Sequence, residues 1–212
     1  MSFRTDAVPA EVVNLLHHSA AILASLPGAY RAGGTALSLY LAHRVSVDLD
    51  FFVAQGFLAR DLRPKIIEAG AFGPISVRDD SIVCTIDEVQ WSLFKYDYAL
   101  LERAEPFAGI QVASIRDIAA MKVVAIGDRG SRKDFYDLYA ILQTGIFDIR
   151  RILEDVVLKF RLRPDHVYHY VKALSYFEDA VRTPDIQEML RIDVHWSDVE
   201  RFFRRLATTL IP

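Results

Sequence analysis

The sequence contains a single cysteine, Cys84, and no apolar run long enough to span a bilayer. One cysteine cannot form an internal disulfide, which fits a reducing compartment. The N-terminus also lacks a basic segment followed by an apolar one, so no secretory signal is predicted. We therefore expect a cytoplasmic protein with no membrane partner.

The sequence also lacks a strong excess of either charge. Its 25 basic and 28 acidic residues give a formal net charge of -3, which argues against a protein that coats nucleic acid over its whole surface. The net charge does not exclude a local basic groove. The sequence has no internal repeat or low-complexity tract, and 212 residues with 52% hydrophobic composition suffice for one core, or for a main domain with a smaller helical part.

Residues 30–53 carry the most informative pattern. A short strand-like run leads into Gly33-Gly34-Thr35, a helix is predicted over 35–42, and a strand is predicted over 45–51. Side chains alternate along a strand, so Asp48 and Asp50 are expected on one face, together with Ser46. Neighbouring carboxylates repel each other, and a shared proton or a hard divalent cation commonly resolves that repulsion.

The glycine turn before this helix suits a phosphate. Glycines let the backbone approach a ligand, and the unpaired N–H groups of a helix N-terminus favour an anion. Beside a carboxylate pair, the turn predicts a site for a nucleoside triphosphate (NTP) and Mg²⁺. The alternatives are a simple turn and a solvated strand edge. Arg44 follows the helix and suits either its C-terminal dipole or a phosphate.

The next segments are predicted as a helix over 59–69 and further strands. A strand is predicted over either 75–77 or 82–86. Asp87-Glu88 is predicted to form a hairpin turn that leads into a second strand over 89–96. If the strand over 89–96 neighbours the aspartate strand, Ser92 faces the same site. Residues 97–108 are expected to form a connection before a short strand over 110–113.

A second constellation begins at residue 114. Helices are predicted over 115–126 and 132–142, separated by a glycine-containing break. Asp134 and Asp137 share a face of the second helix, and Lys122 of the first could meet an aspartate across the break. The alternative is a surface lysine with acids that favour a helix N-terminus.

The rest of the chain is predicted to be helical over 152–160, 166–181 and 197–210. Two groups of basic residues suit either solvated helix faces or an RNA-binding surface. They are Arg150, Arg151, Lys159, Arg161 and Arg163, and Arg201, Arg204 and Arg205.

Two blocks, GGTALSLYLAHRVSVDLDFF and MKVVAIGDRGSRKDFYDLYAIL, resemble the AbiEii/AbiGii toxin family of nucleotidyltransferases, in the DNA polymerase beta superfamily. The resemblance covers roughly residues 28 to 145 in the correct order. It implies an α+β fold with a mixed sheet flanked by helices, divided here into a core over 1–145 and a helical C-terminal region over 146–212.

The resemblance also implies roles for individual residues. Phosphates would contact Gly33, Gly34 and Thr35, and the metal would contact Asp48 and Asp50. The remaining matched site positions are Ser46, Lys122, Asp137 and the nearby Asp134. Lys133 stands where the family pattern has arginine, and the predicted strand over 90–96 lacks the third carboxylate of the wider superfamily. Either two carboxylates suffice, with Asp137 supplying the missing charge, or catalysis has been lost; we favour the first.

The implied activity is Mg²⁺-dependent transfer of a nucleoside monophosphate from an NTP to an acceptor. The resemblance makes RNA, notably the tRNA end, the leading acceptor, and it implies a toxin with a paired antitoxin protein. Two alternatives stay open. One is a catalytically silent module that binds nucleotide or a partner, and the other is a nucleotidyltransferase acting on a protein or a small molecule such as an aminoglycoside.

Overall fold

The computed structural model describes residues 3–78 and 80–210, and the chain divides into two compact units. The first unit ends at Ser114 and the second begins at Ile115. This division differs from the boundary expected after residue 145. It falls earlier because α4 (Ile115–Asp128) packs against α6 (Ile149–Phe160), and α5 (Arg132–Gln143) packs against α4 and α9 (Trp196–Thr208).

Within the described residues of the first unit, seven strands form one mixed sheet in the order β3-β4-β5-β2-β1-β7-β6. β2 is parallel to β5 and antiparallel to β1, and β1 is parallel to β7. This confirms the expected mixed sheet. The strands are β1 (Tyr30–Ala32), β2 (Leu49–Val53), β3 (Ala71–Arg78), β4 (Ser81–Ile86), β5 (Val89–Lys95), β6 (Glu105–Phe107) and β7 (Ile110–Val112).

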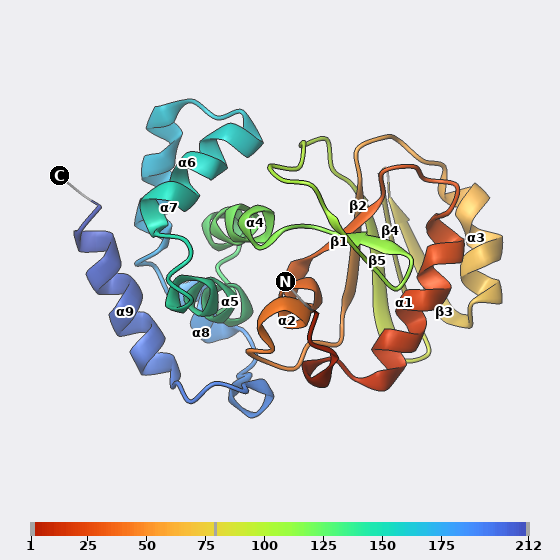
Figure 1. Ribbon diagram of the computed structural model, residues 1–212, viewed down its shortest axis with the longest axis horizontal. Helices are drawn as coiled ribbons and strands as arrows, with labels where there is room; N and C mark the ends of the chain where they lie inside the picture. Colours follow the sequence, from red (N-terminus) through yellow and green to blue (C-terminus); the bar gives the residue numbers. More distant parts are fainter. Residues whose placement is uncertain (1–2, 79, 211–212) are drawn as a thin grey trace. The chain divides into compact units, whose positions relative to one another are not determined.

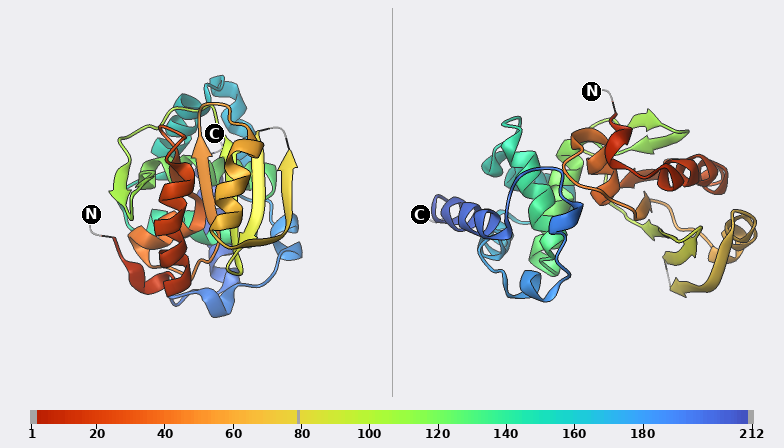
Figure 2. Two further views of the ribbon diagram at one scale, coloured as in Figure 1. Left: turned by 90° about the vertical axis from the view of Figure 1, so that its right-hand side faces the viewer. Right: turned by 90° about the horizontal axis from the view of Figure 1, so that it is seen from below.

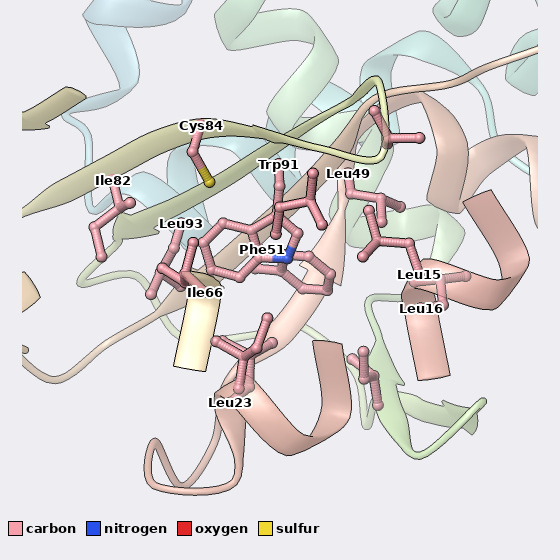
Figure 3. Packing of buried hydrophobic residues seen from close by; sticks show 14 of the residues in the cluster. Leu15, Leu16, Leu23, Leu49, Phe51, Ile66, Ile82, Cys84, Trp91 and Leu93 are labelled. Carbon is pink, nitrogen blue, oxygen red and sulfur yellow. The ribbon is translucent and has the colours of Figure 1, made fainter. Parts of the chain in front are cut away.

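Helices α1 (Ala10–Leu23) and α3 (Ala59–Glu68) cover one face of this sheet (Figures 1 and 2, left). Apolar side chains of α1 and α3 meet those of β2, β4 and β5 in a buried core (Figure 3). The fully buried Trp91 donates its indole N–H to Ser19 Oγ at 3.0 Å, so this polar group has a hydrogen-bond partner inside the core. The residues of this core that are labelled in Figure 3 are Leu15, Leu16, Leu23, Leu49, Phe51, Ile66, Ile82, Cys84, Trp91 and Leu93.

The core fixes which side chains turn away from it. Leu49, Phe51 and Val53 of β2 are fully buried on the α1 and α3 side. Because alternate residues of a strand face opposite sides, Asp50 and Phe52 project from the other face. The sheet thus separates an apolar packing face from a face that carries the candidate site.

Several expectations about the strands need correction. β2 begins at Leu49, not at residue 45, since the preceding segment is held by side-chain hydrogen bonds described below. Both candidate strands over 75–77 and 82–86 exist, as parts of β3 and β4, and β6 lies in the expected connection. Asp87 and Glu88 form the predicted turn between β4 and β5, with φ of 48° and 66°. Two positive φ values are typical of a type I′ hairpin.

In the second unit, α4 packs against α5, α6 and α7 (Val167–Ala173). Two ion pairs join α4 to α6: Arg116 contacts Asp155 at 2.6 Å, and Lys159 contacts Asp117 at 2.7 Å. The helix expected over 166–181 is interrupted, because α7 ends at Ala173 and α8 covers Glu178–Arg182. None of the helices among the described residues is long and apolar enough to cross a membrane.

Two short 3-10 helices, η2 (Pro164–His166) and η3 (Gln187–Met189), complete the second unit, and a third, η1 (Thr5–Ala7), precedes α1. Phe135 of α5 anchors an aromatic core in the second unit. Its ring lies 5.1 Å from Phe177, 5.8 Å from Trp196 and 5.3 Å from Phe203. This core fixes α5, which carries two of the predicted site residues, against α9.

Candidate active site

The glycine turn lies between β1 and α2 (Gly33–Leu41) and contacts the aspartate segment directly. Gly33 has a φ of 79°, and a Cβ placed there would lie 2.8 Å from Asp50 Oδ2. A Cβ on Gly34 would overlap Arg44 Nη2 and lie 3.1 Å from Ser46 Oγ. Both positions therefore exclude a side chain, the first also through its backbone conformation. The predicted contact between turn and carboxylate is present.

Thr35 ties the helix start to the residues before β2. Its Oγ1 donates to the carbonyl oxygen of Asp48 at 2.6 Å and lies 2.8 Å from Ser46 Oγ. Thr35 and Ser46 are both buried, with exposed fractions of 1% and 4%. One turn further along α2, Ser38 Oγ donates to the carbonyl oxygen of Arg44 at 2.9 Å. These bonds replace a strand ladder over 44–48 and explain why β2 starts late.

Asp48 and Asp50 are both half-buried. Asp50 lies opposite Ser92 in the parallel register of β2 and β5, which confirms that Ser92 faces the same side of the sheet. No carboxylate occupies that position. Among the described residues, no group of three His, Cys, Asp or Glu side chains gathers to hold a metal ion.

The donor set nevertheless fits Mg²⁺. This ion prefers oxygen ligands and is commonly held by one or two carboxylates together with waters and substrate phosphates. Asp48 and Asp50 offer two such carboxylates, and the glycine turn lies against the second. The absence of a third carboxylate beside Ser92 leaves a larger share of the coordination to phosphate oxygens and water.

Arg44 is buried, with an exposed fraction of 2%, and its Nη1 donates to the carbonyl oxygen of Val45 at 3.1 Å. Its guanidinium lies against Gly34 at the start of α2, whereas α2 ends at Leu41 with a left-handed Ala42. The structure therefore places this cation at the N-terminal turn and not at the helix C-terminus. A positive charge at this position complements a phosphate at the same turn.

Arg31 on β1 was missed in the sequence reasoning. It is fully buried between β2 and β7, and its guanidinium nitrogens have no hydrogen-bond partner among the described residues. Burial lowers the pKa of Arg31 to about 9, although the negative charge of Asp50 acts in the opposite direction. Arg31 therefore remains a cation at neutral pH, inside the sheet that carries Asp50. No sequence signal distinguished it from an ordinary strand residue.

Lys122, Asp134 and Asp137 meet in the second unit, as expected from their spacing. Lys122 Nζ lies 2.8 Å from Asp134 Oδ1 and 2.6 Å from Asp137 Oδ2. All three residues are buried, so the alternative of a surface lysine is wrong, although Asp134 does lie in the first turn of α5. The basic side chain and both carboxylates thus form one ion-paired group, which we call the lysine cluster.

Asp134 has further partners within the lysine cluster. Ser131 Oγ donates to its Oδ2 at 2.6 Å, and Arg129 Nε donates to the same atom at 3.2 Å. Burial alone raises the pKa of Asp134, but attraction to Lys122 and Arg129 and the hydrogen bonds from Lys122 and Ser131 outweigh it. The net pKa lies below its ordinary value, so Asp134 is ionised at neutral pH.

The basic group around residue 150 is not a continuous surface. Lys159 is fully buried in its pair with Asp117, and Arg151 and Arg163 contact Glu154 and Asp165. Much of its charge is therefore compensated locally. On α9, Arg201 contacts Asp198, and the Arg204 guanidinium lies 4.8 Å from the Phe177 ring centre.

Comparisons with known proteins identify the family of this chain. The family model described as nucleotidyl transferase AbiEii toxin, type IV TA system, matches residues 32–89 and 80–209. An uncharacterized protein of Aquifex aeolicus (strain VF5) is 37% identical over 180 residues, which covers 83% of this chain and 84% of that protein.

Solved structures show the same fold. JHP933 of Helicobacter pylori has a TM-score of 0.52 at 18% identity and covers 96% of this chain and 94% of its own. A second H. pylori protein, provisionally described as a nucleotidyltransferase, has a TM-score of 0.54 at 17% identity. The match covers 95% of this chain and 97% of that protein. With the family match over most of its length, this chain belongs to the AbiEii toxin family of nucleotidyl transferases.

Proposed function

We propose that the chain transfers a nucleoside monophosphate from an NTP to the end of an RNA, with tRNA as the leading acceptor. The observation that carries this proposal is the contact of the Gly33-Gly34 turn with Asp50 and Arg44. A phosphate-binding turn, a carboxylate and a cation occupy one place on the sheet. Those are the groups that nucleotide phosphates and a divalent ion require.

In this proposal the N–H groups at the start of α2 bind the β and γ phosphates, and Arg44 neutralises part of their charge. Asp48 and Asp50 would hold Mg²⁺, which when bound would supply Lewis-acid polarisation of the α-phosphate. A bond forms between the acceptor oxygen and the α-phosphorus, and the bond from that phosphorus to the β-phosphate bridge breaks. Pyrophosphate leaves, and the acceptor proton passes to a base.

Thr35 and Ser46 position these groups. Since Thr35 bonds to the Asp48 carbonyl and lies beside Ser46, it fixes the spacing between the helix start and the first carboxylate. The same contacts and its burial leave Ser46 better suited to positioning than to accepting a nucleotide.

We further propose that Lys122, Asp134 and Asp137 are required for transfer, with Asp137 orienting Lys122 and Lys122 supplying positive charge. The 2.6 Å contact between Lys122 and Asp137 supports the orienting role. In this reading the catalytic core includes residues up to 145, beyond the packing boundary at Ser114. The family match favours a toxin controlled by an antitoxin protein in a reducing cytoplasm.

The test is Mg²⁺-dependent incorporation of each of the four α-labelled NTPs into RNA, protein and small-molecule pools. Wild type is expected to label RNA, and Asp48→Asn to label nothing. Asp61→Asn is the matched control, because its side chain on α3 is 68% exposed, and it should retain full activity. Labelling that persists in Asp48→Asn would contradict the metal-site assignment.

Two other outcomes would replace the proposal. If only protein or only a small-molecule pool is labelled, the chain is a nucleotidyltransferase whose acceptor is not RNA. Nucleotide binding without any labelling would identify a silent binding module. Growth arrest on expression, relieved by Asp48→Asn but not by Asp61→Asn, is the result expected of a toxin that acts through this site.

A further inference from the structure

An aromatic row lies beside Asp50 on the site face of the sheet. The register of β1, β2 and β5 places Phe52 opposite both Tyr30 and Phe94, one pair further along than Asp50 and Ser92. Since Leu49, Phe51 and Val53 face the core, Phe52 and Phe94 face the same way as Asp50. The row therefore continues the candidate active site along β2 and is separate from the hydrophobic core.

The rings are in mutual contact and retain solvent access. The Phe52 ring lies 5.7 Å from Tyr30, 5.8 Å from Phe94 and 5.2 Å from Tyr96, and Tyr98 lies 5.0 Å from Tyr96. Tyr30 is buried, whereas the other four are half-buried. Tyr96 is also fixed through its backbone, whose N–H donates to the carbonyl oxygen of Val53 at 2.8 Å. A fixed, accessible set of rings on a sheet is a geometry suited to stacking bases.

The aromatic row and the glycine turn lie on opposite sides of Asp50, and this arrangement favours the acceptor over the NTP as the ligand of the row. Ala32 lies opposite Asp50 and Tyr30 opposite Phe52, so the turn that follows Ala32 and the aromatic row extend in opposite directions from Asp50. In phosphoryl transfer the attacking and leaving oxygens are roughly in line on opposite sides of the phosphorus. If pyrophosphate leaves toward the turn, the acceptor approaches from the aromatic side. Two residues of strand span roughly 7 Å, which is on the scale of one nucleoside.

We propose that Phe52, Phe94 and Tyr96 bind the terminal base of a single-stranded RNA acceptor by stacking. This rests on the proposed function for the orientation of the NTP, but the stacking itself requires neither metal nor NTP. Every base has an aromatic face, so the surface recognises an unpaired end with little preference for its sequence.

The test measures binding of fluorescent single-stranded RNA by anisotropy, without NTP and in the presence of a metal chelator. Two RNAs are compared, one ending in a normal nucleotide and one whose last nucleotide lacks its base. Wild type is expected to bind the first about 5- to 140-fold more tightly, from about 1–3 kcal/mol for one stacked base. The doubly substituted Phe94→Leu, Tyr96→Leu protein keeps apolar volume but loses two rings, so its preference should fall toward one.

Three controls make the result specific. Phe94→Tyr with Tyr96→Phe retains both rings and should retain the preference. Tyr168→Ala removes a ring that is 51% exposed on α7 and should leave it unchanged. Asp50→Asn, which is expected to abolish transfer, should also leave the preference unchanged, so failure of the proposed reaction and failure of the stacking surface give different results.

The proposal is overturned if wild type binds both RNAs equally. It is also overturned if the two leucine substitutions raise KM for the NTP and not for the acceptor, because the row would then bind the incoming base. If the doubly substituted protein does not fold, Phe94→Leu alone is compared with Phe94→Tyr by the same preference.

Discussion

The two units carry polar clusters of opposite character. In the first, Asp48 and Asp50 are half-buried, Asp50 lies against the glycine turn, and a cation, Arg44, also lies at that turn. In the second, Lys122 is buried and ion-paired with both Asp134 and Asp137. The two carboxylates of the first cluster are partly exposed, whereas the charged groups of the second are buried and contact one another. The two clusters therefore differ in how accessible their charged groups are to a ligand.

The largest effect on stability is expected from Lys122→Met. The substitution leaves Asp134 and Asp137 buried without their shared cation, and breaking a buried pair costs about 3–5 kcal/mol. Urea unfolding of the whole protein measures this loss. Lys172→Met, at an exposed position on α7, is the control and should change the unfolding free energy by less than about 1 kcal/mol. An equally small effect for Lys122→Met would show that the lysine cluster does not hold the second unit together.

Gly34→Ala is expected to impair the first cluster with a smaller effect on stability. A methyl group there overlaps the Arg44 guanidinium, so the arginine must leave the helix start. We expect at least a 10-fold loss of transfer, on the order of 1.4 kcal/mol in transition-state stabilisation. Gly56→Ala is the control, because nothing lies within 4 Å of its added Cβ. Equal activity in the two variants would argue against a role for the turn.

Arg31→Met is expected to stabilise the fold, because burial lowers the pKa of Arg31 by more than attraction to Asp50 raises it. The guanidinium is fully buried with no hydrogen-bond partner among the described residues, so its removal relieves a desolvation penalty. Thermal unfolding measures the gain. A destabilised Arg31→Met protein would instead mean that Arg31 compensates the charge of Asp50.

The smallest effect is a pH dependence from Asp134. Its folded pKa lies below its ordinary value of 3.8, so the ionised carboxylate stabilises the native state above about pH 4 and this contribution is lost as pH falls through the folded pKa. Asp134→Asn should therefore be less stable than wild type at pH 7, by about 1–3 kcal/mol, and the difference should shrink below pH 4. A difference independent of pH would point to packing in place of charge.

Sequence patterns predicted the parts of the fold that depend on local chemistry. The glycine turn, the β4–β5 hairpin at Asp87-Glu88 and the pairing of Lys122 across a helix break all follow from residue type and spacing. Each of these features is determined by a few neighbouring residues, and each was read from them.

Features decided by distant contacts were not predictable. β2 starts at Leu49, and the carbonyl oxygen of Asp48 just before it accepts a hydrogen bond from the Thr35 hydroxyl, 13 positions earlier in the chain. Arg31 looked like an ordinary strand residue, since its burial depends on strands β2 and β7 on either side. The division at Ser114 similarly reflects helix packing that no local pattern encodes. Alternation did predict which side Phe52 faces, but its aromatic partners depend on the strand order.

The central claim is that the first cluster binds Mg²⁺ and NTP, whereas the lysine cluster is required for the fold as well as for transfer. Thermal unfolding of wild type, Asp50→Asn and Lys122→Met, with and without a non-hydrolysable NTP and Mg²⁺, tests it directly. Ligand at 100 times its Kd should stabilise wild type by about 2.7 kcal/mol. Asp50→Asn should keep the unliganded stability and lose the ligand-induced gain, whereas Lys122→Met should lose stability before ligand is added. A full ligand-induced gain in Asp50→Asn would contradict the account.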